Sequence, residues 1–392
     1  MLAKINKTKV LVAGISSLVL SVGIARFAYT PMLSIMQQQT GLSQSMGALL
    51  ASINYIGYFL GVLLTASIRD IRVKHTCYCI GMVLAVVTTF SMGLTSNVWL
   101  WSGLRLLSGL SSAAGVLMSS GLILNWLISN KKNAQLGFHF CGIGLGIVVA
   151  ASLPSLTYQI LDWKQLWYVY GALSVLLLIP ALAWLPRPAS QQFKVNDGQV
   201  DSSPSAKFLR YMKLGYFCAG VGYVVSATFI VAIVNSALGS SNEGNAVFIL
   251  LGLAAMFAPI WDKISMKMGR LNALILACLL QTLGVLLPTL STNIAVLLVS
   301  AVLFGNTFIA IVNLVMTMSG QYYPSNPAKM MAKMTISYAF AQIIAPIGIA
   351  IMVAHHLSYL DGLYFAGAIM IAGTLSMIKL KSLEKPSSAV HA

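Results

Sequence analysis

The chain has 392 residues, of which 58% are hydrophobic and only 8% charged, with a mean hydropathy of +0.84 and a formal net charge of +16. Soluble proteins carry about 25% charged residues, so this composition excludes an ordinary soluble domain, a disordered chain and a coiled coil. The apolar residues form runs that are long enough to cross a bilayer, which takes about 20 residues per helix. We therefore predict an all-α, polytopic membrane protein without a second, soluble domain.

Twelve apolar runs are predicted to be transmembrane helices. In chain order, these predicted helices 1 to 12 cover 10–36, 44–67, 76–95, 98–126, 136–158, 164–186, 211–238, 245–261, 271–290, 294–318, 331–354 and 360–379. We expect helix 1 to be retained, because its apolar stretch continues past Arg26 and is too long for the apolar region of a cleaved leader. None of the five cysteines falls in a predicted outside loop, so no disulfide framework is implied.

The basic residues lie almost entirely on one side of this predicted topology. With the N-terminus in the cytoplasm, 21 of the 24 Lys and Arg residues fall in inside segments, whereas Lys164 lies outside and Arg26 and Arg105 lie within helices. Because short cytoplasmic loops are enriched in Lys and Arg, we expect both termini in the cytoplasm and a location in the inner (plasma) membrane. The positive charge then reflects topology and contact with anionic lipid, and no binding of nucleic acid is expected.

A polar stretch near the middle divides the chain into two parts. Residues 187–207 form the longest polar segment, with prolines and charged residues, and we interpret them as a cytoplasmic linker. The linker separates an N-terminal six-helix half, 1–186, from a C-terminal six-helix half, 208–392. The halves look related, because Gly103–Gly115 in helix 4 resembles Val299–Ile311 in helix 10. Paired repeats with a site between them are typical of secondary transporters.

Four short segments carry a resemblance to a known family. Gly23–Pro31, Gly142–Gly146 and Gly222–Phe229 resemble the major facilitator superfamily, in the subgroup usually called YbfB/YjiJ-like. Arg105-x-x-x-Gly109 is similar to the arginine motif that the superfamily carries in helix 4. The resemblance covers essentially the whole chain. It implies a 6+6 major-facilitator fold, a central cavity lined mainly by helices 1, 4, 7 and 10, and alternating access.

The chain also departs from the superfamily's pattern. The loop motif Gly-x-x-x-Asp-Arg-x-Gly-Arg-Arg is reduced after helix 2 to Ile68–Lys74, without its glycines. After helix 8, Met266 is assigned to the position that would hold the motif's Asp. The Gly-Pro pair of the drug-antiporter motif in helix 5 is missing as well. These departures disfavour a drug–proton antiporter.

The predicted helices contain few ionisable residues. Arg26 lies in helix 1 and Arg105 in helix 4, no Asp or Glu is expected in the interior of any membrane span, and Asp262 is assigned to an inside loop. A buried arginine is costly unless it is paired or hydrated. The two arginines are predicted at similar depth in the outer half of the membrane. If both face the cavity, they form an anion site, because guanidinium groups bind carboxylate and phosphate well. For Arg26 we favour a substrate or gating role, whereas for Arg105 a structural strut is an equal alternative.

His139 in helix 5 is the one other ionisable candidate. Histidine changes charge near physiological pH, so His139 is a candidate for proton coupling, with a hydrogen-bonded structural histidine as the alternative. Neutral polar residues complete the predicted substrate site, and the alternative for each of them is a hydrogen bond that joins helices. These residues are Tyr29, Asn54, Ser112, Tyr223, Asn306, Asn313, Tyr338 and Gln342.

The sequence favours a secondary transporter for a small organic solute. In the predicted site, the N-terminal half contributes the cationic side chains and the C-terminal half contributes amide and phenol side chains. This combination suggests an anionic or zwitterionic substrate. We expect a monomer without cofactor, metal or enzymatic activity, and either proton coupling or uniport. One alternative is efflux of drugs or other hydrophobic compounds, which predicts that loss of both arginines is tolerated. A more remote alternative is a membrane sensor or enzyme, for which the sequence offers no metal cluster, nucleophile motif or phosphate loop.

Overall fold

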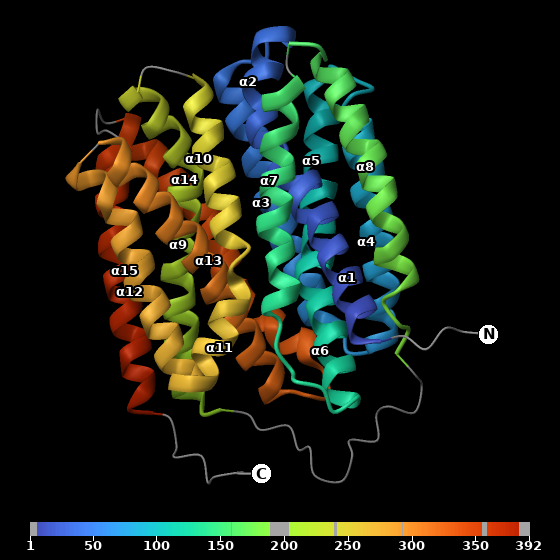
Figure 1. Cartoon of the computed structure of the whole chain (residues 1–392), viewed down its shortest axis with the longest axis vertical. Coiled ribbons are helices and arrows are strands. Elements are labelled where there is room, and N and C mark those ends of the chain that lie inside the picture. Colours follow the sequence, from blue (N-terminus) through green and yellow to red (C-terminus); the bar gives the residue numbers. More distant parts are fainter. Residues whose placement is uncertain are drawn as a thin grey trace.

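A computed structural model describes residues 6–157, 159–188, 204–238, 241–291, 293–354 and 359–383, and all regular structure in them is helical (Figure 1). The first group of helices comprises α1 (Lys7–Leu18), η1 (Val19–Phe27, a π-helical turn), α2 (Tyr29–Thr40), α3 (Gln44–Ser67), α4 (Ile71–Ser91), α5 (Val98–Ala113), η2 (Ala114–Met118, π-helical), α6 (Ser119–Ser129), α7 (Gly137–Thr157) and α8 (Trp163–Ala183). The second group comprises α9 (Ala206–Leu238), α10 (Ser241–Ala255), α11 (Ala258–Met268), α12 (Arg270–Leu290), α13 (Ile294–Tyr322), α14 (Pro327–Ala354) and α15 (Tyr359–Lys381).

The two groups of helices stand side by side, with most helices running along the long axis of the molecule (Figure 1). Helix α10 packs along α7, and α14 packs along α3, so these two pairs form the main contact between the groups. The predicted linker 187–207 lies for the most part outside the described residues. The boundaries of the two halves at 1–186 and 208–392 therefore stay a prediction.

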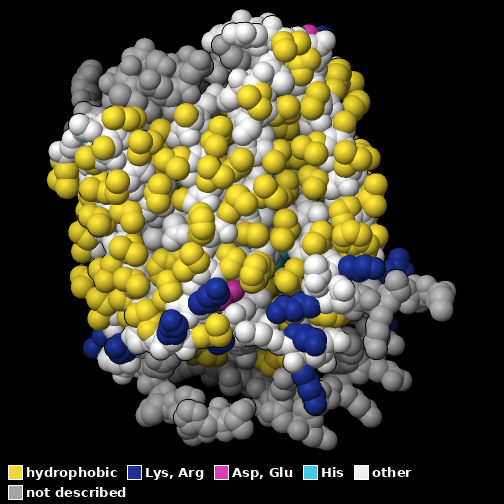
Figure 2. Space-filling model, in the orientation of Figure 1, with side chains coloured by type: hydrophobic (Ala, Val, Ile, Leu, Met, Phe, Trp, Pro, Cys, Tyr) yellow, Lys and Arg dark blue, Asp and Glu magenta, His cyan; other side chains and the backbone are white. Residues whose placement is uncertain are grey.

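Within the described residues, ten helices are long and apolar enough to cross a membrane, or up to eleven if the bent pair α10–α11 is one span. Apolar side chains cover most of the visible face (Figure 2), as expected for a surface that faces lipid. The prediction of an all-α, multi-pass membrane protein is confirmed. The count of twelve helices stays a prediction.

The predicted helix 245–261 is not continuous. Helix α10 ends at Ala255, and α11 begins at Ala258 after a bend of 40°. Pro259 lies in the first turn of α11, where its missing N–H is tolerated. Because α11 continues to Met268, Asp262 lies on a helix and is only 6% exposed. The prediction that Asp262 lies in a loop is wrong, whereas the absence of carboxylates from the interior of the membrane spans stays a prediction.

The first span contains a π-helical turn at its middle. The backbone N–H of Ala28 donates to the carbonyl of Gly23, five residues earlier, at 3.1 Å, which is the π-helical spacing. Gly23 lies so close to Gly146 of α7 that a Cβ atom on Gly23 would overlap the Gly146 backbone. Turns of this kind are frequent at functional sites. In this protein the turn contains Arg26.

One end of the molecule is rich in Lys and Arg, and these side chains gather at the lower end of the face in Figure 2. We call it the basic end and define it by Arg69, Lys74, Lys131, Lys132, Lys263, Lys267 and Lys329. Several hydrogen bonds join the two groups of helices at this end, among them those from the Asn326 side chain to the carbonyl of Arg69 at 2.7 Å and from the Gln321 side chain to the carbonyl of Ala134 at 3.0 Å. Lys74 Nζ donates to Asn326 Oδ1 at 2.7 Å, and the backbone N–H of Gly137 donates to Asp262 Oδ2 at 2.9 Å.

Candidate functional site

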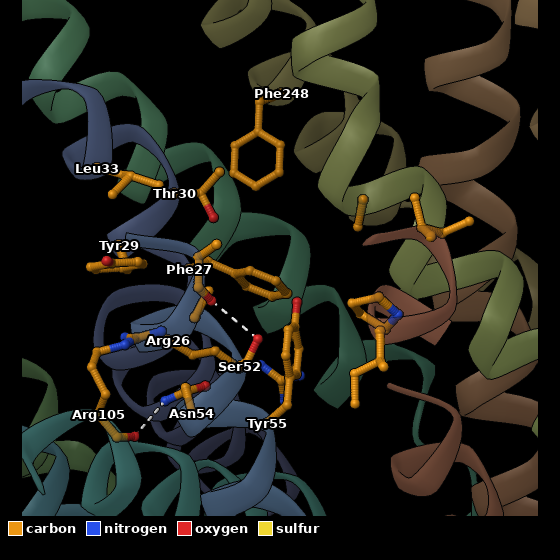
Figure 3. Close-up of a pocket in the computed structure, with 16 residues that line it drawn as sticks. Arg26, Phe27, Tyr29, Thr30, Leu33, Ser52, Asn54, Tyr55, Arg105 and Phe248 are labelled. Carbon is orange, nitrogen blue, oxygen red and sulfur yellow. Dashed lines mark hydrogen bonds between the residues drawn. The ribbon is translucent and has the colours of Figure 1, made fainter. Parts of the chain in front are cut away.

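A cavity of about 520 Å³ lies between the two groups of helices (Figure 3). Its lining combines two arginines with apolar and small polar side chains, and none of the described residues that line it is acidic. The lining residues are Arg26, Phe27, Tyr29, Thr30, Leu33, Ala48, Ala51, Ser52, Asn54, Tyr55, Arg105, Ala227, Phe248, Pro346, Ile347 and Ile349.

The cavity lies away from the basic end. Helix α3 contributes residues 48–55 from its first half, whereas its other end leads to Arg69. Helix α14 contributes residues 346–349, whereas its first turns carry Lys329. The contacts between Lys74 and Asn326, and between Gly137 and Asp262, therefore close the molecule on the basic side of the cavity.

The helices that form the cavity differ from those that the family resemblance implies. Predicted helices 1, 2 and 11 supply most of the lining, through η1, α2, α3 and α14. The fourth predicted helix contributes Arg105 alone, and the seventh contributes Ala227. Helix α13, which corresponds to predicted helix 10, contributes none of the described lining residues.

Arg26 lies on η1 and is only 7% exposed. Its Nη2 donates to Oε1 of Gln342 on α14 at 2.5 Å. The guanidinium carbon lies 4.9 Å from the ring centroid of Tyr55 and 4.6 Å from that of Tyr58, so two aromatic rings stabilise the cation. Its Nε is buried and has no hydrogen-bond partner in the part of the chain that the structure describes. Arg26 therefore keeps an unused donor beside a cavity whose described lining holds no acidic residue.

Arg105 lies on α5 and is fully engaged with its neighbours. Its Nη1 donates to the carbonyl of Ala25 at 3.1 Å, and its Nε donates to the carbonyl of Leu50 at 3.4 Å. The guanidinium carbon lies 4.3 Å from the ring centroid of Tyr29. These contacts join α5 to η1, α2 and α3. They favour the strut alternative, although Arg105 also borders the cavity.

Two neutral residues of the predicted site line the cavity beside the arginines. The Tyr29 hydroxyl donates to the carbonyl of Gly47 at 3.0 Å. The Asn54 side-chain NH₂ donates to the carbonyl of Arg105 at 3.0 Å (Figure 3). Both bonds lie within the first group of helices and hold α2, α3 and α5 in register around the arginines.

Three other predicted site residues make hydrogen bonds between helices outside the cavity lining. Ser112 donates to the carbonyl of Ser21 at 2.7 Å. Asn306 accepts from the indole N–H of Trp261 at 2.8 Å. Asn313 donates to Asp262 Oδ1 at 2.8 Å. These positions fit the helix-joining alternative, and a contact of these residues with substrate stays a prediction.

Tyr223 and Tyr338 belong to a buried aromatic stack in the second group of helices. The ring centroid of Tyr338 lies 4.6 Å from that of Tyr216 and 5.7 Å from that of Tyr223. Tyr223 also stacks on Phe308 at 5.2 Å. Neither tyrosine is among the described residues that border the cavity. Gln342 lies one helical turn after Tyr338 and reaches the cavity residue Arg26 through its side chain.

His139 lies on α7 inside the first group of helices, and none of its surface is exposed. Its Nε2 lies 2.9 Å from the hydroxyl of Ser120 and 3.4 Å from that of Ser119. His139 is not among the residues that line the cavity. These contacts fit the alternative of a structural histidine.

The sequence interpretation overlooked the apolar and aromatic walls of the site. Phe27 and Phe248 both line the cavity and contact each other edge-on, with ring centroids 6.4 Å apart, and the Tyr58 ring stabilises the Arg26 cation. Tyr58 follows Tyr55 by three residues and therefore shares a helix face with it. That spacing was the available signal for Tyr58. Phe248 has no comparable signal, because it lies in the uninterrupted apolar stretch 246–255 of α10.

The comparisons with known proteins agree with this architecture. The family model described as "Uncharacterised MFS-type transporter YbfB" matches residues 18–377. No curated protein matches the chain significantly. Among solved structures, a crystal structure of a point mutant of the nucleoside transporter NupG matches with a TM-score of 0.65 and 12% sequence identity, over 96% of this chain and 100% of that chain.

The similarity to NupG concerns the fold alone, because the sequence identity is low. It confirms the expected major-facilitator fold, and the family match covers most of the chain. The family match indicates a non-enzymatic, membrane-embedded transporter with a small-molecule substrate. The chain belongs to the major facilitator superfamily, in the family of YbfB-like MFS-type transporters.

Proposed function

We propose that this protein carries a small organic anion or zwitterion across the membrane, and that the anionic end binds Arg26. The observation that carries the proposal is a buried arginine with an unpartnered Nε, beside a cavity whose described lining holds no acidic residue. A cation held in a low-dielectric site without a counter-ion favours a ligand that brings one. A carboxylate accepts two parallel hydrogen bonds from guanidinium and fits this requirement.

The rest of the lining supports a substrate with an apolar body. Phe27, Leu33, Phe248, Ile347 and Ile349 surround the cavity beyond Arg26. A volume of about 520 Å³ lies within the range of ordinary small-molecule sites. Monocarboxylates with an aromatic or aliphatic body match this combination of one charge and apolar walls.

The contacts on the basic side of the cavity support alternating access. In this arrangement the two groups of helices meet at the basic end, and the cavity lies on the other side. By the distribution of Lys and Arg, we assign the basic end to the cytoplasm, both termini to the same side, and the protein to the inner (plasma) membrane. The structure then corresponds to an outward-facing state, and transport requires the basic-end contacts to open.

The test is a binding measurement on the purified full chain in detergent. We expect benzoate or hexanoate to raise the melting temperature, because a ligand of the folded state stabilises it, and we expect the neutral benzamide and hexanamide to have a much smaller effect. Arg26→Gln should abolish the carboxylate effect. Arg270→Gln is the matched control, because Arg270 also donates to a glutamine, Gln321, but lies outside the cavity. Carboxylate binding that survives Arg26→Gln contradicts the proposal.

Efflux of hydrophobic compounds is the second candidate, and the largely apolar lining of the cavity favours it. It predicts stabilisation by lipophilic cations instead of carboxylates. It also predicts that transport in proteoliposomes survives when both arginines that line the cavity are replaced by Gln. Loss of transport in that double variant, with a normal yield of purified protein, rejects this candidate.

A further inference from the structure

The side chain of Gln342 accepts one of the two hydrogen bonds that Arg26 would donate to a bound anion. A guanidinium group offers Nε–H and Nη2–H on one edge as a parallel pair of donors. In this protein Nη2 donates to Gln342 Oε1 at 2.5 Å, and the buried Nε has no partner among the described residues. One of the two positions that a carboxylate would fill is therefore held by an amide oxygen, and the other is open to a ligand.

The position of Gln342 links this bond to the movement of helix α14. Gln342 is 2% exposed and lies on α14, in the second group of helices, whereas Arg26 lies on η1 in the first. Pro346 follows Gln342 by four residues and lines the cavity. Proline has no N–H, so the backbone carbonyl of Gln342 lacks its helical hydrogen bond. The residue that contacts Arg26 is thus also the residue whose backbone carbonyl lacks its hydrogen bond within α14.

We propose that Gln342 is an internal competitor for the substrate, whose carboxylate displaces the amide oxygen from Arg26 and binds both Nε and Nη2. This inference rests on the proposed function. A charged acceptor forms stronger hydrogen bonds with guanidinium than a neutral amide does, so a bidentate carboxylate wins the exchange. The exchange breaks the Arg26–Gln342 contact between η1 and α14 and releases α14 beside Pro346. In the empty carrier, Gln342 returns to Arg26 and restores that contact.

The first test replaces Gln342 by a residue of similar length without an acceptor for Arg26. In Gln342→Met, benzoate no longer has to break a hydrogen bond to a charged group, and we expect its Kd to fall roughly tenfold in isothermal titration calorimetry. Benzamide affinity should stay unchanged. Gln281→Met is the matched control, because Gln281 is also a buried glutamine, on α12 outside the cavity, and it should leave the benzoate Kd unchanged.

The second test places a carboxylate permanently at the same position. In Gln342→Glu, the tethered carboxylate should pair with Arg26, raise the melting temperature of the ligand-free protein and abolish benzoate binding. The melting temperature of the ligand-free variant does not depend on the choice of probe. A lower melting temperature, or retained benzoate binding, contradicts the competitor role.

The outcomes separate this inference from the proposed function. If wild type binds benzoate and Arg26→Gln does not, the anion site stands. An unchanged or higher benzoate Kd in Gln342→Met then overturns the competitor role alone, and a higher Kd would make Gln342 a substrate contact. If neither benzoate nor hexanoate binds wild type, the proposed function fails and this inference fails with it.

Discussion

The carboxylate of Asp262 on α11 accepts a hydrogen bond from the backbone N–H of Gly137, the first residue of α7, at 2.9 Å. Its second oxygen accepts from the Asn313 side chain at 2.8 Å. A negative charge at a helix N-terminus is stabilised by the unpaired N–H groups and the helix dipole. Asp262 therefore joins the two groups of helices on the basic side of the cavity, and in the orientation proposed above this side opens in an inward-facing state.

Removing the Asp262 carboxylate should shift the molecule toward opening at the basic end. In Asp262→Ala, the Gly137 N–H loses its partner in the closed state only, which costs about 1–3 kcal/mol, whereas the Asn313 amide, in the same group of helices as Asp262, loses its partner in either state. Spin labels placed at Lys131 and Lys267, which are both exposed, allow the distance between the two groups to be measured by double electron–electron resonance. We expect Asp262→Ala to have a larger fraction of molecules at long label–label distance than wild type. The labels require the five native cysteines to be replaced first.

The control for this experiment is Asp162→Ala. Asp162 caps α8, and its side chain accepts from Gln165 of the same helix. Its loss should leave the distance distribution between the labels unchanged. A distribution that is the same in Asp262→Ala and in wild type would show that the Asp262 contact does not hold the basic end closed.

Asp262 also shows where reasoning from the sequence failed. The apolar run of predicted helix 8 ends at Trp261, before Lys263 and Lys267, although α11 continues to Met268. A short helix that leaves the membrane is amphipathic, so it resembles a charged loop in a search for apolar runs. The loop motif also fits the segment after helix 8 at a different position from the one expected above. Ala258 and Asp262–Lys263 have the spacing of its Gly-x-x-x-Asp-Arg start, whereas Met266 does not.

The arginines of the site were predictable because charges are rare in transmembrane helices. Arg26 and Arg105 do border one cavity, as does Asn54. The sequence does not distinguish Asn306 and Ser112, which lie outside the cavity lining, from residues that line it. Helices α5 and α13 contact neighbouring helices on several sides, so a polar residue on any side finds a hydrogen-bond partner. Which side faces the cavity is decided by packing between segments far apart in the chain, such as α3 against α14.

Arg105 should contribute to stability more than to substrate binding. Arg105→Lys keeps the positive charge but loses the planar arrangement of donors that reaches the carbonyls of Ala25 and Leu50. The carbonyl of Ala25 keeps the hydrogen bond from the Ser108 hydroxyl, but each hydrogen bond lost from a charged group costs about 1.5–3 kcal/mol. We expect a lower melting temperature with a benzoate Kd close to that of wild type. Loss of benzoate binding at an unchanged melting temperature would instead make Arg105 a substrate contact.

The close approach of η1 to α7 should not tolerate a side chain at Gly23. A Cβ atom there would overlap the backbone of Gly146, and overpacking of this kind costs about 1–3 kcal/mol. Gly23→Ala should lower the melting temperature in detergent. In Gly103→Ala, by contrast, no described atom lies within 4 Å of the new Cβ, and alanine favours the helix, so the melting temperature should stay equal or rise. Equal effects of the two substitutions would contradict this account of the η1–α7 contact.

His139 should act as a structural residue rather than as a proton carrier. It is fully buried, its Nε2 lies 2.9 Å from the Ser120 hydroxyl, and it does not line the cavity. In His139→Gln we expect the melting temperature to fall, because a side chain of different shape replaces the ring between α6 and α7. The pH dependence of benzoate uptake into proteoliposomes should stay that of wild type, since proton transfer through His139 requires a titratable group that glutamine lacks. A pH-dependent uptake in wild type that becomes independent of pH in His139→Gln would assign the coupling proton to His139, with Gln281→Met as the control for an unrelated buried substitution.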